Sequence, residues 1–153
     1  MKDLCLIPAH KIASLIRKKE VSAVEVARAH LARIERLNPI LNAFVDYRPE
    51  RVLVQARQVQ EAVQSGTELG PLHGVPLSIK SSINVAGHRC EAGSILRKGH
   101  IANEDAPLVA RLRSAGAIIL GVTNAPEFLM AWETDNVLYG RTNNPWEIGR
   151  AHV

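Results

Sequence analysis

Apolar side chains recur at intervals of three and four residues along the first third of the chain, and this spacing predicts helices. A first helix is expected from about residue 9 to residue 19, with Ile12 and Ile16 on its buried face. A second helix is expected to begin after Ser22, because the run Ser-Ala-Val-Glu fits a capping box. The N-terminal part of the protein is therefore expected to be helical.

Proline and glycine set the expected ends of these helices. Pro39 is expected to stop the second helix, because the residue before a proline disfavours helical backbone. A third helix is expected from about Pro49 to Ser65, since proline suits the first turn of a helix. Gly66 fits the left-handed position that caps many helices at their C-terminal end.

Three short apolar runs predict strands. They are LNAFVDY at residues 41–47, VPLSI at residues 75–79 and AIILGVT at residues 117–123. A long and weakly patterned loop, roughly residues 84–104, follows the second run, and loops of this length in a compact domain are often functional. The order of helices and apolar strands predicts an α/β fold in which helices cover both faces of a sheet.

Composition and charge narrow the class of protein. The chain has 153 residues, of which 46% are hydrophobic, and this is enough for one domain with a core. The net charge of +4 comes mostly from residues 1–65, where 11 Lys and Arg face 7 Asp and Glu. A scattered excess of this size is typical of a solvated surface, so no direct nucleic-acid partner is expected. The longest apolar run is far shorter than the ~20 residues that span a bilayer, so no membrane partner is expected either.

Cysteine and histidine usage bear on the cellular setting of the protein and on metal binding. Cys5 and Cys90 are the two cysteines and form no CxxC pair, which favours a reduced cytoplasmic setting over secretion. The six histidines show no spacing typical of metal ligands. We therefore expect a cytoplasmic protein without a metal or another cofactor.

Lys80 is the strongest candidate for chemistry. Of the six lysines it is the one that directly follows an apolar strand, and Ser81 and Ser82 come next. A lysine in such a place is most often salt-bridged or extends its ammonium group to water. A neutral lysine can act as a general base, provided that burial in a closed pocket disfavours its charged form.

Cys90 and Glu91 raise a rival hypothesis. A nucleophilic cysteine, a glutamate and a lysine are the catalytic residues of nitrilase-type hydrolases. The simpler interpretation is a packed cysteine in a loop, and it is favoured because a reactive thiol needs a surrounding that stabilises the thiolate.

Three segments together resemble the amidase signature family of serine hydrolases. They are GPLHGVPLSIKSSINVAG, EDAPLVARLRSAGAIILGVTNAPEF and YGRTNNPW, and they occur in the order and with the spacing of that family. The resemblance covers almost the whole chain and is weakest in the helical N-terminal part. It implies a mixed sheet wrapped by helices on both faces and a catalytic triad of Ser, cis-Ser and Lys.

The resemblance also implies roles for individual residues. The lysine of the family's GVP motif falls on Lys80, which would take a proton through the cis-serine from the nucleophilic serine. The nucleophile would then attack the amide carbonyl of a small-molecule substrate and form an acyl-enzyme, which water hydrolyses. The segment that lines the acyl pocket in the family falls here on Leu129, Met130 and Ala131.

The chain departs from the family at three places. Ser81 stands where many members have an acid, and Val122 where many have a lysine. After NPW the family enters a Gly/Ser-rich loop that carries the cis-serine and later the nucleophile, whereas this chain reads EIGRAHV. We therefore expect an N-terminal fragment with an incomplete fold, which lacks both triad serines and is itself inactive.

The expected organisation follows from this comparison. Residues 1–66 would form an N-terminal helical part, and residues 67–147 would begin the α/β core of an amidase. Residues 148–153 would be an artefactual tail.

Three functions remain open at this point. The favoured one is a stand-alone amidase that hydrolyses a carboxamide C–N bond. The sequence leaves open whether this enzyme forms a homo-oligomer. The second is an amidotransferase A-type subunit, which hydrolyses glutamine for tRNA transamidation and needs partner subunits. The run GVTNAPEFLMAWETDN lacks the GTNM-type signature associated with that subunit. The third is a non-catalytic domain that binds amides or a partner.

Overall fold

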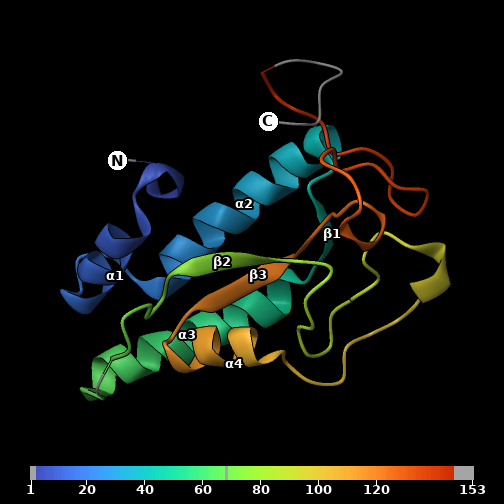
Figure 1. Cartoon of the computed structure of the whole chain (residues 1–153). Coiled ribbons are helices and arrows are strands. Elements are labelled where there is room, and N and C mark those ends of the chain that lie inside the picture. Colours follow the sequence, from blue (N-terminus) through green and yellow to red (C-terminus); the bar gives the residue numbers. More distant parts are fainter. Residues whose placement is uncertain (1–2, 68, 147–153) are drawn as a thin grey trace. The chain divides into compact units, whose positions relative to one another are not determined.

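The computed structural model describes residues 3–67 and 69–146 (Figure 1). The α-helices are α1 (Ala9–Arg17), α2 (Ala23–Leu41), α3 (Pro49–Ser65) and α4 (Pro107–Ser114). The strands are β1 (Phe44–Tyr47), β2 (Pro76–Lys80) and β3 (Ile118–Thr123). Short 3-10 helices are η1 (Leu4–Leu6), η2 (Ile95–Arg97) and η3 (Glu127–Leu129). The tail expected at residues 148–153 lies outside the described residues.

The chain forms two compact units whose segments interleave along the sequence. The first unit comprises the described residues up to Ile34, then Arg48–Leu77 and Pro107–Leu120. The second comprises Glu35–Tyr47, Ser78–Ala106 and the described residues from Gly121 onward. The division expected at residue 66 stays a prediction.

The sheet has the strand order β1-β3-β2. β1 pairs with β3 in antiparallel fashion, with Tyr47 opposite Gly121. β2 runs in the same direction as β3, because Ile118 N–H donates to the carbonyl of Val75 and Ser81 N–H donates to that of Thr123, each at 2.9 Å. Helices with a mixed sheet confirm the α/β class predicted from the sequence.

In the first unit, the apolar faces of the helices form the core. The fully buried side chains include Ile16, Val26, Val52, Val109, Ile118 and Ile119. Gln55 links α3 to α4 and β3. Its side-chain oxygen accepts from Arg113 (2.9 Å) and from the N–H of Ile119 (3.3 Å). The helix α3 has the bounds predicted from the sequence, and Gly66 caps it with a φ of 74°.

The prediction that Pro39 stops the second helix is wrong. The helix α2 continues through Pro39 to Leu41. Proline removes one helical N–H, but at this position only the last turn follows it. Asn38 then secures the exit of the chain, because its side-chain oxygen accepts from Ala43 N–H (2.9 Å) and Phe44 N–H (2.7 Å).

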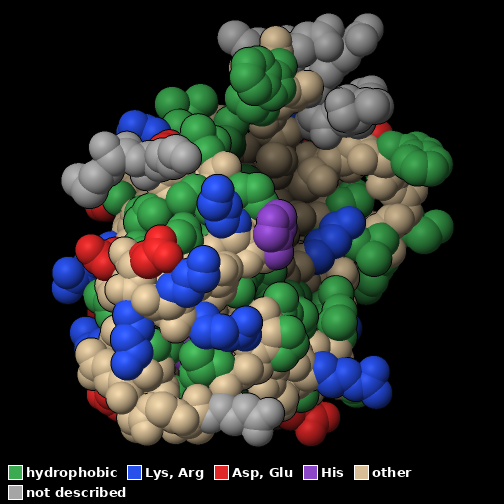
Figure 2. Space-filling view, turned by 90° about the vertical axis from the view of Figure 1, so that its left-hand side faces the viewer, with side chains coloured by type: hydrophobic (Ala, Val, Ile, Leu, Met, Phe, Trp, Pro, Cys, Tyr) green, Lys and Arg blue, Asp and Glu red, His purple; other side chains and the backbone are tan. Residues whose placement is uncertain are grey.

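The surface is mixed in charge. Figure 2 shows Lys and Arg side chains spread over one face among acidic and hydrophobic side chains. Among the described helices, none combines the length and the apolar character that crossing a bilayer requires. Within the described ranges, no group of three or more His, Cys, Asp and Glu residues is placed to hold a metal ion.

Candidate functional site

Lys80 is the last residue of β2, as the sequence predicts. Its neighbour Ile79 is buried, at 6% exposure, whereas Lys80 is exposed. Successive side chains of a strand point to opposite faces, so burial of Ile79 directs Lys80 to the open face of the strand. Within this chain, Lys80 therefore lies on the exposed side of the strand end.

Ser81 lies on the buried side of the same strand end, at 1% exposure. Its N–H donates to Thr123 (2.9 Å) and its carbonyl accepts from Ala92 N–H (3.1 Å). Its hydroxyl has no hydrogen-bond partner among the described residues. Ser81 thus joins β2 to β3 and to the long loop, and it faces away from Lys80.

The turn that contains the predicted acyl-pocket residues is joined to this strand end through Ala92. The carbonyl of Ala92 accepts from Phe128 N–H (2.9 Å), while its own N–H donates to Ser81. The buried hydroxyl of Ser94 donates to the carboxylate of Glu127 (2.7 Å). There is no room for a side chain between these segments, since a Cβ on Gly93 would lie 2.5 Å from a backbone oxygen.

The turn itself has an unusual backbone. Phe128 and Leu129 both adopt a positive φ, of 46° and 64°. Such values cost of order 1–3 kcal/mol for residues other than glycine and often occur at functional sites. Leu129 is 48% exposed and Met130 86% exposed, and Ala131 is exposed too. The structure therefore presents these three side chains on the surface of the second unit.

Cys90 and Glu91 lack the properties of a nucleophile and its base. Cys90 is 2% exposed, and burial raises the pKa of its thiol. The carboxylate of Glu91 is 1% exposed and accepts from Gly99 N–H and from the hydroxyl of Tyr139. A protonated thiol beside an engaged carboxylate fits the packed-cysteine interpretation and not the nitrilase-type hypothesis.

Sequence reasoning missed the asparagines that fix the C-terminal segment. Asn124 directly follows β3, and its side chain accepts from Asn136 (2.7 Å) and donates to the carbonyl of Gly140 (3.0 Å). Asn42 donates to the carbonyl of Tyr139 (2.5 Å). Asparagine indicates turns in general, but nothing local in the sequence pairs Asn42 with Tyr139, 97 residues away.

A buried Asp–His pair was missed as well. The carboxylate of Asp46 in β1 lies 3.4 Å from Nδ1 of His88 and accepts from Arg89 N–H (3.0 Å). It fastens the start of the long loop to β1, so this loop is held at several points in the second unit.

Comparison with known proteins decides the family. The family model described as Amidase matches residues 25–152. This chain belongs to the amidase family. The resemblance stated from the three motifs is thereby confirmed.

Curated relatives align with this chain over most of its length. The glutamyl-tRNA(Gln) amidotransferase A-type subunit of Acidothermus cellulolyticus is 41% identical over 150 residues, which cover 98% of this chain and 30% of the relative. Fatty-acid amide hydrolase 2-A of Danio rerio is 40% identical, with 96% and 29% covered. Indoleacetamide hydrolase of Bradyrhizobium diazoefficiens is 44% identical, with 88% and 26% covered. This amidase-family chain thus spans about 30% or less of these relatives' length.

Solved structures confirm the amidase signature fold. The peptide amidase of Stenotrophomonas maltophilia matches with a TM-score of 0.84 at 32% identity, over 94% of this chain and 31% of that one. A fatty acid amide hydrolase matches with a TM-score of 0.89 at 26% identity, over 97% and 27%. The fold of this amidase-family chain therefore corresponds to a part of the fold of these enzymes.

Proposed function

We propose that the whole protein containing this chain is an amidase that hydrolyses the C–N bond of a small carboxamide in the cytoplasm. The observation that carries the proposal is the family match over residues 25–152, which includes the GVP motif and its strand-end lysine. Amide hydrolases appear among the relatives by name, as fatty-acid amide hydrolase 2-A and indoleacetamide hydrolase.

In this proposal Lys80 is the general base of a Ser–cis-Ser–Lys triad. The neutral amine accepts a proton, through the cis-serine, from the serine that attacks the amide carbonyl. The amine product leaves, and water then hydrolyses the acyl-enzyme to release the carboxylate. The chain alone leaves Lys80 exposed. We assign its burial, and both serines, to the part of the relatives' length that the chain does not span.

Leu129, Met130 and Ala131 are proposed to contact the acyl group of the substrate. Support comes from their exposure and from the turn that holds them, which is joined to the Lys80 strand end by two successive backbone hydrogen bonds. Apolar side chains on a rigid turn suit the apolar part of an aryl or alkyl amide.

A second candidate is an amidotransferase A-type subunit. It is supported by the 41% identity with the A-type subunit of the Acidothermus cellulolyticus glutamyl-tRNA(Gln) amidotransferase over 98% of the chain. This function differs from the first in its requirement for glutamine and partner subunits.

Ammonia release by the whole protein separates the two functions. The proposal predicts release from simple aryl or alkyl amides by the purified protein alone. Release from glutamine only, and only with partner subunits, would favour the amidotransferase. Binding of amides without any release, by a protein that retains both serines, would favour the non-catalytic domain.

A further inference from the structure

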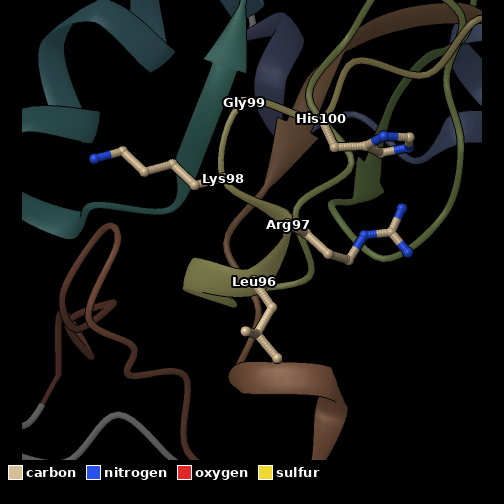
Figure 3. A pocket seen from close by; sticks show the side chains of 5 residues that line it. All are labelled: Leu96, Arg97, Lys98, Gly99 and His100. Atoms are coloured by element: carbon tan, nitrogen blue, oxygen red, sulfur yellow. The ribbon is translucent and has the colours of Figure 1, made fainter.

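A hollow of about 500 Å³ lies in the long loop of the second unit, away from any role assigned so far. It is lined by five consecutive residues, Leu96, Arg97, Lys98, Gly99 and His100 (Figure 3). Three of these residues carry basic side chains. Among the described residues, no acidic side chain lines the hollow.

The backbone around this hollow is held in place. The N–H of Gly99 donates to the buried carboxylate of Glu91, and Gly99 adopts a φ of 83° that suits glycine. The N–H of His100 donates to the carbonyl of Arg97 (2.9 Å), and the carbonyl of His100 accepts from Cys90 N–H (3.0 Å). The loop therefore presents its side chains from a defined turn.

Arg97 is the ordered cation of the group. Its Nε–H donates to the carbonyl of Cys90 at 3.0 Å, which fixes the plane of the guanidinium group. Within the described part of the chain, no hydrogen bond uses its two terminal NH₂ groups. Figure 3 shows Arg97 and His100 directed to the same side of the loop, whereas Lys98 points the other way.

We propose that Arg97 and His100 form a binding site for a small oxyanion, either a phosphate or a carboxylate. A fixed guanidinium group offers two parallel N–H donors that match the geometry of both groups. The imidazole of His100 adds a donor from the same side, whereas Lys98 points away and is not part of the site. This site is independent of the proposed amide hydrolysis.

The test is a titration of the whole protein that contains this chain, isotope-labelled at glycine and histidine and followed by the amide NMR signals of Gly99 and His100. Inorganic phosphate and acetate are added separately, and chloride keeps the ionic strength constant. We expect saturable shifts of these signals with at least one of the two probes. The probe that binds more tightly identifies the site as one for phosphates or for carboxylates. Absence of saturable shifts with both probes would overturn the proposal.

Substitutions test whether Arg97 and His100 contribute to oxyanion binding. Arg97→Gln should weaken binding about tenfold or more, because hydrogen bonds between a guanidinium group and an oxyanion are roughly twice as strong as neutral ones. Arg36→Gln removes the same charge from an exposed position of α2 and should leave binding nearly unchanged. If Arg97→Gln fails to fold, Arg97→Lys and His100→Gln provide the same comparison. Equal weakening by Arg36→Gln would show non-specific attraction and would overturn the site.

Discussion

Glu91 is predicted to be a structural carboxylate whose removal destabilises the second unit. Glu91→Ala leaves the N–H of Gly99 and the hydroxyl of Tyr139 without their acceptor at a site that is 1% exposed. Hydrogen bonds to a charged group contribute roughly 1.5–3 kcal/mol each. The loss of two such bonds predicts a fall of about 3–6 kcal/mol in the free energy of unfolding. This is a large part of the ~5–15 kcal/mol that stabilises a typical domain.

Tyr139→Phe should have a smaller effect on stability than Glu91→Ala. It removes only the hydroxyl donor and leaves the Glu91 carboxylate and its bond from Gly99 N–H in place. We expect it to cost about half as much, roughly 1.5–3 kcal/mol. For a chain of this size, 1 kcal/mol lowers the midpoint of thermal unfolding by about 2–4 °C. Tyr139→Phe should therefore lower the midpoint by about 3–12 °C.

Thermal unfolding followed by circular dichroism measures both effects. The matched control is Glu104→Ala, which removes a glutamate that is exposed in the same loop region. Exposed substitutions of this kind change stability by about 0.5 kcal/mol or less. If Glu91→Ala and Glu104→Ala unfolded at the same temperature, the structural role assigned to the buried carboxylate would be refuted.

Three further substitutions or modifications test other parts of the structure. Gly93→Ala should lower the unfolding midpoint more than Gly99→Ala, because both have a positive φ but only the first would place a Cβ 2.5 Å from a backbone oxygen. Burial raises the pKa of the Cys90 thiol, so alkylation of Cys90 by iodoacetamide should be slow at neutral pH and faster in alkali or after unfolding. Fast labelling of Cys90 in the folded chain would contradict this. Hydrogen bonds from Ser22 lower the pKa of Glu25, so their stabilisation is present above the unfolded pKa and is lost as the pH falls through the folded one. Ser22→Ala should therefore raise the pKa of Glu25 in an NMR titration, and an unchanged value would argue against the capping box.

Local signals predicted the helices well. The helix α3 begins at Pro49 and ends at Ser65 as expected, because a proline in the first turn and a C-terminal glycine act on the backbone next to them. The prediction for Pro39 is wrong because it considers the proline alone and not the side chain beside it. The N–H groups of Ala43 and Phe44 donate to the side-chain oxygen of Asn38 and stabilise the end of the helix, and the sequence does not show that these groups meet.

The candidate site was predicted only in part. Strand periodicity placed Lys80 at the end of β2, but its exposure depends on what covers the open face of that strand, which no local pattern encodes. The role of Glu91 depends on Tyr139, 48 residues away, and on Gly99. Contacts of this range come from the folded chain and not from spacing.

Family motifs supplied the information that periodicity lacks. The three segments that resemble the amidase signature family indicated the family, and the match over residues 25–152 confirms it. The roles of Leu129, Met130 and Ala131 remain predictions, as does that of the strand-end lysine.

The rate of amide hydrolysis by the whole protein with Lys80→Ala tests the central claim most directly. A positioned general base typically accelerates a reaction by ~10²–10⁴-fold, so kcat should fall by at least about a hundredfold. Lys11→Ala, at an exposed position of α1, is the matched control and should retain the full rate. Circular dichroism should show the same fold for both variants. A Lys80→Ala enzyme that retained kcat within a few-fold of the unmodified protein would contradict the assignment of Lys80 as the base.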